Sequence, residues 1–330
     1  MAKRVLLKLL GITYILCWIG ALYADAQPVR TLKKTDELLN TRFNNIEDVC
    51  CDGNGYLYVV DSGTNKIHIC RLNGGLIKTF GGAGQGHGEF LAQPNKAFLR
   101  ISAGNDGNLY ITDTGNKRLS VFSGDGVFLK DYIISHPMLD RPQVNSKGDI
   151  YMLLDGGDTL IGRYDRDIRL TNRLLKKKAH YDFRYGKPDK YLITINDLWL
   201  KKLITSTDNI ILISNASLSV HIFTSSDELA NKFIISNTIF LQDYKKRIKA
   251  ARSNHQYVLP FNAALDKYSN IIYLSYFNES LDNFELYRYR TNGTLIDILR
   301  FSDKITYIFC VEKSRLFIVT NKSTISIFDL

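Results

Sequence analysis

Three aspartates offer the most regular chemistry in the sequence, because each one directly ends a short apolar run. The residues are Asp61, Asp113 and Asp155. Carboxylates repeated in this manner could bind a divalent metal such as calcium. The same recurrence is more typical of carboxylates that cap tight turns by accepting backbone N–H bonds. We adopt the turn-capping interpretation and predict no metal ligands and no cofactor, with a divalent metal as the alternative.

The histidines form no recognisable catalytic or metal-binding pattern. They are spread along the chain at His68, His87, His136, His180, His221 and His255. The sequence has no H-E-x-x-H pair and no G-x-S-x-G nucleophile motif. The glycine-rich stretch Gly81–Gly88 also lacks the Lys-Ser/Thr pair of a phosphate-binding loop. We therefore predict no catalytic residues.

Positive charge is the remaining chemical signal, since the formal net charge is +10. A basic surface often serves solubility alone, but arginine also binds carboxylate or phosphate groups in a bidentate manner. We predict an anionic ligand, either an acidic glycan or the acidic loop of a protein partner. The predicted contact residues are His87, Arg118, His136, Arg141, Arg184 and Arg252. For Arg118 alone, an ion pair with an aspartate and packing of its stem is an equally good explanation.

Short strands must position these side chains, because the sequence repeats a strand–turn–strand pattern. Tyr56–Ile69 aligns without a gap with Asn108–Val121, and in both segments an apolar strand ends in Asp before a Gly/Asn-rich turn. Weaker copies recur about every 40 to 60 residues, a period typical of propeller blades. These copies lie at Asp149–Asp155, Asn209–Asn215, Ile272–Ser275 and Leu316–Thr320. The sequence thus predicts an all-β fold, a six-bladed β-propeller of four-stranded antiparallel blades.

An N-terminal strand is predicted to close the ring. The last copy reaches only its third strand at Ile325–Leu330, whereas Val29–Lys33 resembles the outer strands of the other copies. Pairing the two segments would cover an exposed strand edge. We predict that Val29–Lys33 lies beside Ile325–Phe328.

The clearest repeats, within residues 44–133, resemble the NHL repeat. The resemblance rests on the glycine-rich segment Gly81–Phe90, on Gln93-Pro94 and on Leu109–Leu119. Propellers of this kind include lyases and lactonases with a metal in the central channel, as well as binding and sensor domains. Because the resemblance covers blade-forming residues and no catalytic set, we favour a binding protein. A propeller enzyme of the lyase or lactonase type, with a divalent metal in the channel, is the alternative.

The first 26 residues have the pattern of a secretory signal peptide. Met1–Arg4 is basic, Leu9–Leu22 is almost wholly apolar, and Ala24–Ala26 supplies small residues for cleavage. The apolar run is shorter than the ~20 residues that a spanning helix needs. We predict that residues 27–330 form one exported propeller, periplasmic or extracellular, a monomer without a membrane span. An exported protein of this kind is not expected to bind nucleic acid.

The cysteines that follow the predicted signal peptide are Cys50, Cys51, Cys70 and Cys310. Cys51 and Cys310 align at the same inner-strand position of two blades that become neighbours only when the ring closes. Stacked strands lie ~10 Å apart, whereas a disulfide needs a Cα separation of about 5.5 Å. We therefore expect free, buried thiols.

Overall fold

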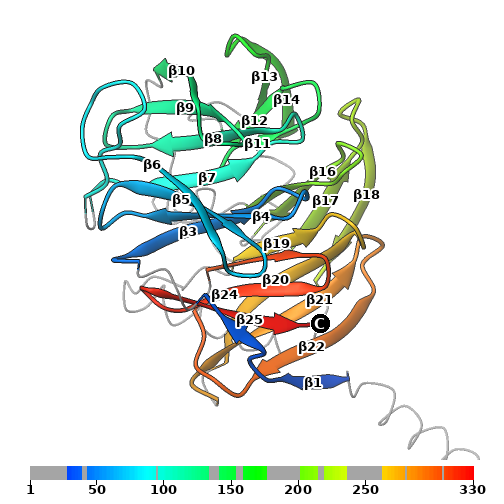
Figure 1. The fold of residues 1–330 in the computed structure, drawn as a ribbon. Coiled ribbons are helices and arrows are strands. Elements are labelled where there is room, and N and C mark those ends of the chain that lie inside the picture. Colours follow the sequence, from blue (N-terminus) through cyan, green and yellow to red (C-terminus); the bar gives the residue numbers. More distant parts are fainter. Residues whose placement is uncertain are drawn as a thin grey trace, which may run out of the picture.

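We describe the fold from a computed structural model of the chain. The described residues are 28–38, 43–93, 96–133, 141–153, 159–176, 201–214, 219–235, 262–278, 281–306 and 308–330. Every regular element in these residues is a β-strand, and the strands form six sheets arranged as the blades of a propeller (Figure 1). The predicted six-bladed, all-β fold is confirmed.

Each blade is built on four antiparallel strands that follow one another outward from the axis. Blade one consists of β3 (Ile46–Cys51), β4 (Tyr56–Asp61), β5 (Lys66–Arg71) and β6 (Leu76–Gly81). Blade two consists of β7 (Leu99–Ala103), β8 (Asn108–Asp113), β9 (Arg118–Ser123) and β10 (Phe128–Ile133). Blade three consists of β11 (Gln143–Val144), β12 (Ile150–Leu153), β13 (Thr159–Tyr164) and β14 (Leu170–Lys176).

The second half of the ring repeats this order. Blade four consists of β15 (Lys201–Ile204), β16 (Ile210–Ser214), β17 (Ser219–Phe223) and β18 (Leu229–Ile234). Blade five consists of β19 (Ala263–Asp266), β20 (Ile271–Asn278), β21 (Asn283–Arg290) and β22 (Leu295–Phe301). Blade six consists of β23 (Phe309–Glu312), β24 (Arg315–Asn321) and β25 (Thr324–Asp329), with β2 (Asp36–Glu37) as its outer strand.

The core lies between the faces of neighbouring blades. The inner strands contact one another in turn around the axis, and β23 of blade six returns to β3 of blade one. At this last junction Val49, Leu57 and Phe317 are fully buried in one apolar cluster. Burial of an aliphatic or aromatic side chain contributes about 1.5–3 kcal/mol, so stacking holds the blades together.

Tight turns set the spacing of strands and blades. Asn65 and Lys117 take the same place before β5 and β9, and both adopt a left-handed φ, of 55° and 54°. Gly126, with a φ of +75°, lies in the turn before β10, where a Cβ would meet the Phe80 ring of blade one at 2.6 Å. Glycine is required there because the turn needs a positive φ and the neighbouring blade packs directly against it.

An N-terminal segment closes the ring, as predicted, but through different residues. β2 pairs with β25, and the N–H of Leu38 donates to the carbonyl oxygen of Ile325 at 3.1 Å. β1 (Val29–Leu32) pairs in parallel with β22 and adds a fifth strand to blade five, as Figure 1 shows in blue beside orange. The prediction that Val29–Lys33 lies beside Ile325–Phe328 is therefore wrong.

Buried side chains explain this difference. Leu32 packs in the cluster between blades five and six with Ile305. Leu38 and Phe43 are 3% and 2% exposed in the cluster between blades six and one. The alternating pattern of Val29–Lys33 suits any exposed edge, so the buried residues Leu32, Leu38 and Phe43 decide which edge each part of the segment takes.

Residues 1–26, the predicted signal peptide, lie outside the described residues. Within the part of the chain that the structure describes, no helix is long and apolar enough to cross a membrane.

Candidate functional site

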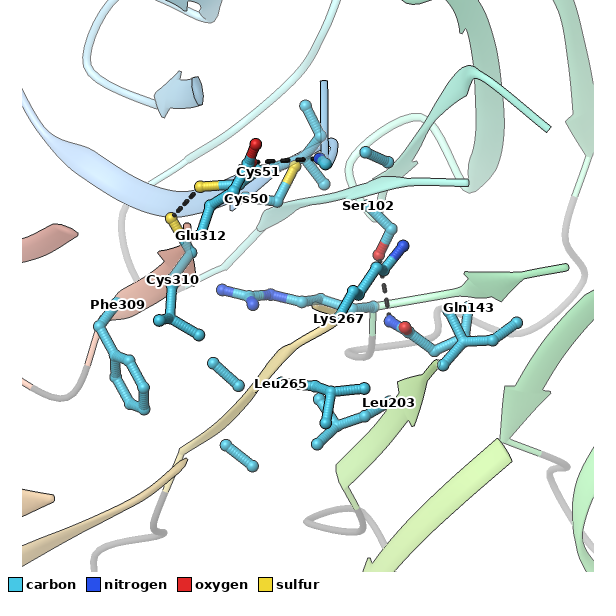
Figure 2. A pocket seen from close by; sticks show the side chains of 18 of the residues that line it. Cys50, Cys51, Ser102, Gln143, Leu203, Leu265, Lys267, Phe309, Cys310 and Glu312 are labelled. Atoms are coloured by element: carbon cyan, nitrogen blue, oxygen red, sulfur yellow. Dashed lines mark hydrogen bonds between the residues drawn. The ribbon is translucent and has the colours of Figure 1, made fainter. Parts of the chain in front are cut away.

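A pocket lies on the propeller axis, since residues of all six inner strands line it. Its volume is about 90 Å³. The polar side chains of its lining include Ser102, Arg141, Gln143, Lys267 and Glu312, several of which Figure 2 shows together with apolar side chains and thiols. A concave site with an apolar wall and a few polar groups is suited to a small group with a charged or polar head.

One layer of the channel is charged. Asp48, Arg100 and Lys201 occupy the same register position on β3, β7 and β15. Glu47 precedes Asp48 in the chain, and Arg141 lies just before β11. In the described residues, three cations therefore share this end of the inner strands with two carboxylates.

Two ion pairs engage both carboxylates. Arg141 donates from Nε to Asp48 Oδ2 at 2.9 Å, and one of its terminal nitrogens donates to Asp48 Oδ1. Asp48 is 1% exposed, and its Oδ2 also accepts the N–H of Ile101 at 3.0 Å. Arg100 donates to Glu47 Oε1 at 2.9 Å. Each pair joins blade one to another blade, so the pairs brace the channel.

Arg100 and Arg141 each form an ion pair in this layer, whereas Lys201 forms none with a carboxylate of the described residues. Burial, followed by the charges of Arg141 and Arg100, lowers the pKa of the Lys201 amine to about 7. A partly buried cation beside two others is electrostatically costly. An anion bound at this position would offset that cost.

A second pair of ionisable groups lies where the inner strands end. The amine of Lys267 donates to Asn105 Oδ1 at 2.6 Å, and burial lowers its pKa. Glu312 is 2% exposed and accepts the N–H groups of Gly53 and Gly55 at 3.1 and 3.0 Å. Burial raises the pKa of its carboxyl group. Glu312 thus holds a turn, and Lys267 supplies positive charge at this end of the pocket.

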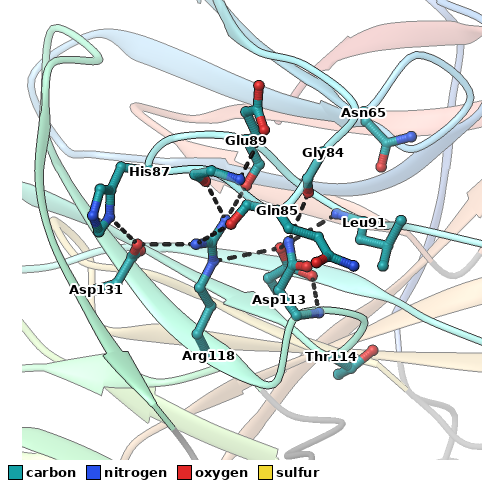
Figure 3. A network of polar contacts seen from close by, with 12 residues as sticks. Asn65, Gly84, Gln85, His87, Glu89, Leu91, Asp113, Thr114, Arg118 and Asp131 are labelled. Carbon is teal, nitrogen blue, oxygen red and sulfur yellow. Dashed lines mark hydrogen bonds and ion pairs between the residues drawn. The ribbon is translucent and has the colours of Figure 1, made fainter.

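The structure places one predicted contact residue, Arg141, in the axial pocket. His87 lies instead beside the outer strand of blade two, where its Nδ1 is 3.0 Å from Asp131 and its ring is 5.3 Å from that of Phe128 (Figure 3). Arg118 contacts the same Asp131. The structure therefore separates these two residues from Arg141. The other predicted residues, His136, Arg184 and Arg252, lie outside the described residues.

Arg118 organises the glycine-rich loop before β7 (Figure 3). Its guanidinium donates to the carbonyl oxygens of Gln85, Gly86 and Glu89 at 3.2, 2.8 and 2.5 Å. It also forms an ion pair with Asp131 at 3.0 Å, and the residue is only 6% exposed. These contacts engage both terminal nitrogens of Arg118. The ion pair with an aspartate, and not ligand binding, therefore explains the position of this side chain.

Two recurring aspartates cap turns, as predicted. Asp61 accepts the N–H groups of Asn44 and Asn45 at 3.0 and 2.9 Å. Burial alone would raise the pKa of Asp61, but these donors lower it overall. Asp113 accepts a backbone N–H of the turn after β8 at 3.1 Å. Asp155 lies outside the described residues, among which no group of three or more His, Cys, Asp or Glu side chains is placed to hold a metal ion.

Sequence reasoning missed the charged layer. Asp48 follows Glu47, Arg100 lies between Leu99 and Ile101, and Lys201 precedes Lys202, so none of the three stands out as part of a motif. A signal was nevertheless present in the repeats, because the three charged residues stand at equivalent positions of three inner strands. Charge at such a position is unusual, since charged residues are rarely buried in a protein core.

Known proteins resemble this chain in fold. No family model and no curated protein matches it, so the NHL resemblance stays a prediction. A candidate exported protein of Bacteroides fragilis is 12% identical, with a TM-score of 0.58, over 91% of this chain and 99% of that chain. A DUF4221 family member from Bacteroides vulgatus is 12% identical, with a TM-score of 0.56, over 90% and 97%. A virginiamycin B lyase from Staphylococcus aureus is 11% identical, with a TM-score of 0.48, over 86% and 79%. At these identities the first two similarities support the propeller fold alone.

Proposed function

We propose that the chain is an exported binding propeller whose axial site takes an anionic group, a carboxylate, of its ligand. The observation that carries this proposal is the partly buried Lys201, which shares its register position with Arg100 on the inner strands and lies beside the guanidinium groups of Arg100 and Arg141. Both carboxylates of the same layer are already paired with the arginines. The pattern of residues 1–26 supports export.

The electrostatics favour an anion over a neutral group. A charge taken out of water is costly unless it is paired, and Lys201 meets further positive charge from its neighbours. A carboxylate that accepts a hydrogen bond from the amine would form a charge-assisted bond, which is stronger than a neutral one. The ligand would therefore supply the counter-charge that the described part of the protein does not.

The size of the pocket limits what enters. Arg141 is the residue of the charged layer that lines the pocket of about 90 Å³, so a carboxylate with a few neighbouring atoms would enter beside Arg141 and the Lys201 amine next to it. The rest of a larger ligand would stay at the channel opening. A uronic acid residue of a glycan and the acidic loop of a protein both present such a group. Their shared carboxylate is the basis of the proposal, and the binding experiment distinguishes the two sources.

Substitution of Lys201 tests this site without leaving a carboxylate of the same layer unpaired, as substitution of Arg100 or Arg141 would. Calorimetry would compare the parent, Lys201→Met and Lys232→Met, titrated with galacturonate oligomers or with an acidic peptide. Lys232 is an exposed residue on the outer strand of the same blade, so it is the matched control. We expect Lys201→Met to weaken binding about tenfold or more, and Lys232→Met to leave it unchanged. Equal affinity in parent and Lys201→Met would reject the site.

The affinity should also depend on pH. The carboxylate is ionised throughout the neutral range, whereas the Lys201 amine loses its proton as pH rises through about 7. Because the anion binds the protonated amine, affinity should stay flat below pH 7 and fall as pH rises above it. In Lys201→Met this fall should disappear. A parent whose affinity is constant from pH 6 to about pH 9 would contradict the role of Lys201.

A further inference from the structure

Two thiols face each other across the junction where the ring closes. Cys51 lies on β3 of the first blade and Cys310 on β23 of the last blade. Their sulfur atoms are 2.9 Å apart and unbonded, and Figure 2 shows the two side chains pointing toward each other. The thiols are free, as expected, but stacking distance does not keep these two sulfur atoms apart, because they reach toward each other from the two inner strands.

Strand alternation explains why Cys51 faces this junction. The sequence alignment of Cys51 with Cys310 was wrong by one residue: in the register of the sheets Cys50 and Cys310 are equivalent, since they lie opposite Tyr58 and Phe317. Successive side chains of a strand point to opposite faces. Cys50 accordingly packs between blades one and two, whereas Cys51 packs with Cys310 between blades six and one.

The backbone around the pair is fixed from both blades. Glu312, two residues after Cys310, accepts the N–H groups of Gly53 and Gly55 at 3.1 and 3.0 Å. These bonds tie the end of β23 to the turn that follows Cys51. These bonds therefore hold the two strands in the register that places the sulfur atoms close together.

We propose that Cys51 and Cys310 form a reversible disulfide that covalently joins the first blade to the last. The sulfur atoms need to approach only from 2.9 Å to the bond length of about 2.05 Å. The bond would border the axial pocket, since both residues line it. An oxidising compartment, as export would provide, favours the disulfide form.

The chemistry needs an external disulfide as oxidant. The Cys51 thiolate attacks one sulfur of the oxidant, which breaks the S–S bond of the oxidant and releases its first thiol. Cys310 then attacks the mixed disulfide at the Cys51 sulfur and releases the second thiol. The two protons of the protein thiols end on the two released thiols, so the protein loses two electrons and the oxidant gains them. Burial raises the pKa of the Cys51 thiol, so the pair is suited to a stable link and not to rapid exchange.

The link would reinforce a weak point of the fold. The outer strand of blade six is only Asp36–Glu37, so few backbone bonds hold the closing segment. A crosslink between the first and the last inner strand closes a very long loop, and such a constraint lowers the entropy of the unfolded chain. The ring should therefore open less readily when the pair is oxidised.

Peptide mapping of the full chain tests the proposal. The purified protein would be treated with hydroxyethyl disulfide or with dithiothreitol, alkylated under denaturing conditions, digested and examined without reduction. We expect a linked Cys51–Cys310 peptide, two hydrogen atoms lighter than the sum of its parts, only in the oxidised sample. Oxidised protein in which both residues are alkylated, or in which either is linked elsewhere, would overturn the proposal.

A melting experiment gives an independent readout. Oxidation should raise the melting temperature by about 5 °C. Cys51→Ser should lose this shift, and Cys50→Ser, which changes the neighbouring thiol on the opposite face, should keep it. If Cys51→Ser does not fold, Cys310→Ser takes its place. A shift that survives loss of either partner would contradict the link.

Discussion

Replacement of Thr35–Leu38 by a Gly/Ser linker of equal length should lower the melting temperature by about 10 °C. The change removes β2, exposes the edge of β25 and takes the buried Leu38 out of the core. Loss of a buried leucine costs about 2–5 kcal/mol and each lost backbone bond about 1 kcal/mol. For a domain of this size, a loss of about 5 kcal/mol corresponds to a shift of that order.

The same replacement of Val29–Leu32 is the control. It removes β1, which only adds an extra parallel strand to blade five, and one buried leucine, Leu32, so both variants lose a strand and a buried leucine and differ in whether the ring is closed. Differential scanning calorimetry should show a clearly smaller decrease, because the six-bladed ring stays closed. If the two variants melt at the same temperature, β2 does not close the ring in the way the structure indicates.

Arg118→Met should destabilise the protein by about 3–5 kcal/mol. The guanidinium holds three carbonyl oxygens of the glycine-rich loop and the carboxylate of Asp131. Removing one partner of a buried ion pair leaves an uncompensated charge, which carries a cost of this size. Denaturation by urea would measure the loss.

Arg315→Met is the matched control for this substitution. Its ion pair with Asp329 is exposed, with side chains 45% and 56% accessible, and exposed pairs contribute about 0–1 kcal/mol. The double variant Arg118→Met with Asp131→Asn should recover part of the stability, because the stranded carboxylate is gone. Similar stabilities for Arg118→Met and Arg315→Met would contradict the structural role of Arg118.

Local repetition made the blades predictable. The segment Tyr56–Ile69 and its copies specify strands and turns through residues close in sequence, such as the Asp61 cap. The edge taken by Val29–Lys33 was not predictable, since an alternating segment fits several exposed edges. Distant apolar contacts, of Leu38 with blade six above all, make that choice.

The site was less predictable than the fold for the same reason. Arg141 was identified from its charge, yet its partner Asp48 lies two blades away around the ring. Lys201 carried no sequence motif, and its unusual environment arises only when three inner strands meet. The Cys51–Cys310 contact likewise depends on which face of a strand each side chain occupies, a property that the register of the sheets sets.

Titration of the Lys201 amine tests the central claim most directly. Lysines labelled with ¹³C at Cε would be followed by NMR as pH is varied, and the signal missing in Lys201→Met would be assigned to this residue. We expect a pKa near 7 in the free protein and an increase of about one unit or more when galacturonate oligomers saturate the site. A pKa near the ordinary lysine value of about 10.4 in the free protein, unchanged by the oligomers, would contradict an anion site in the axial channel.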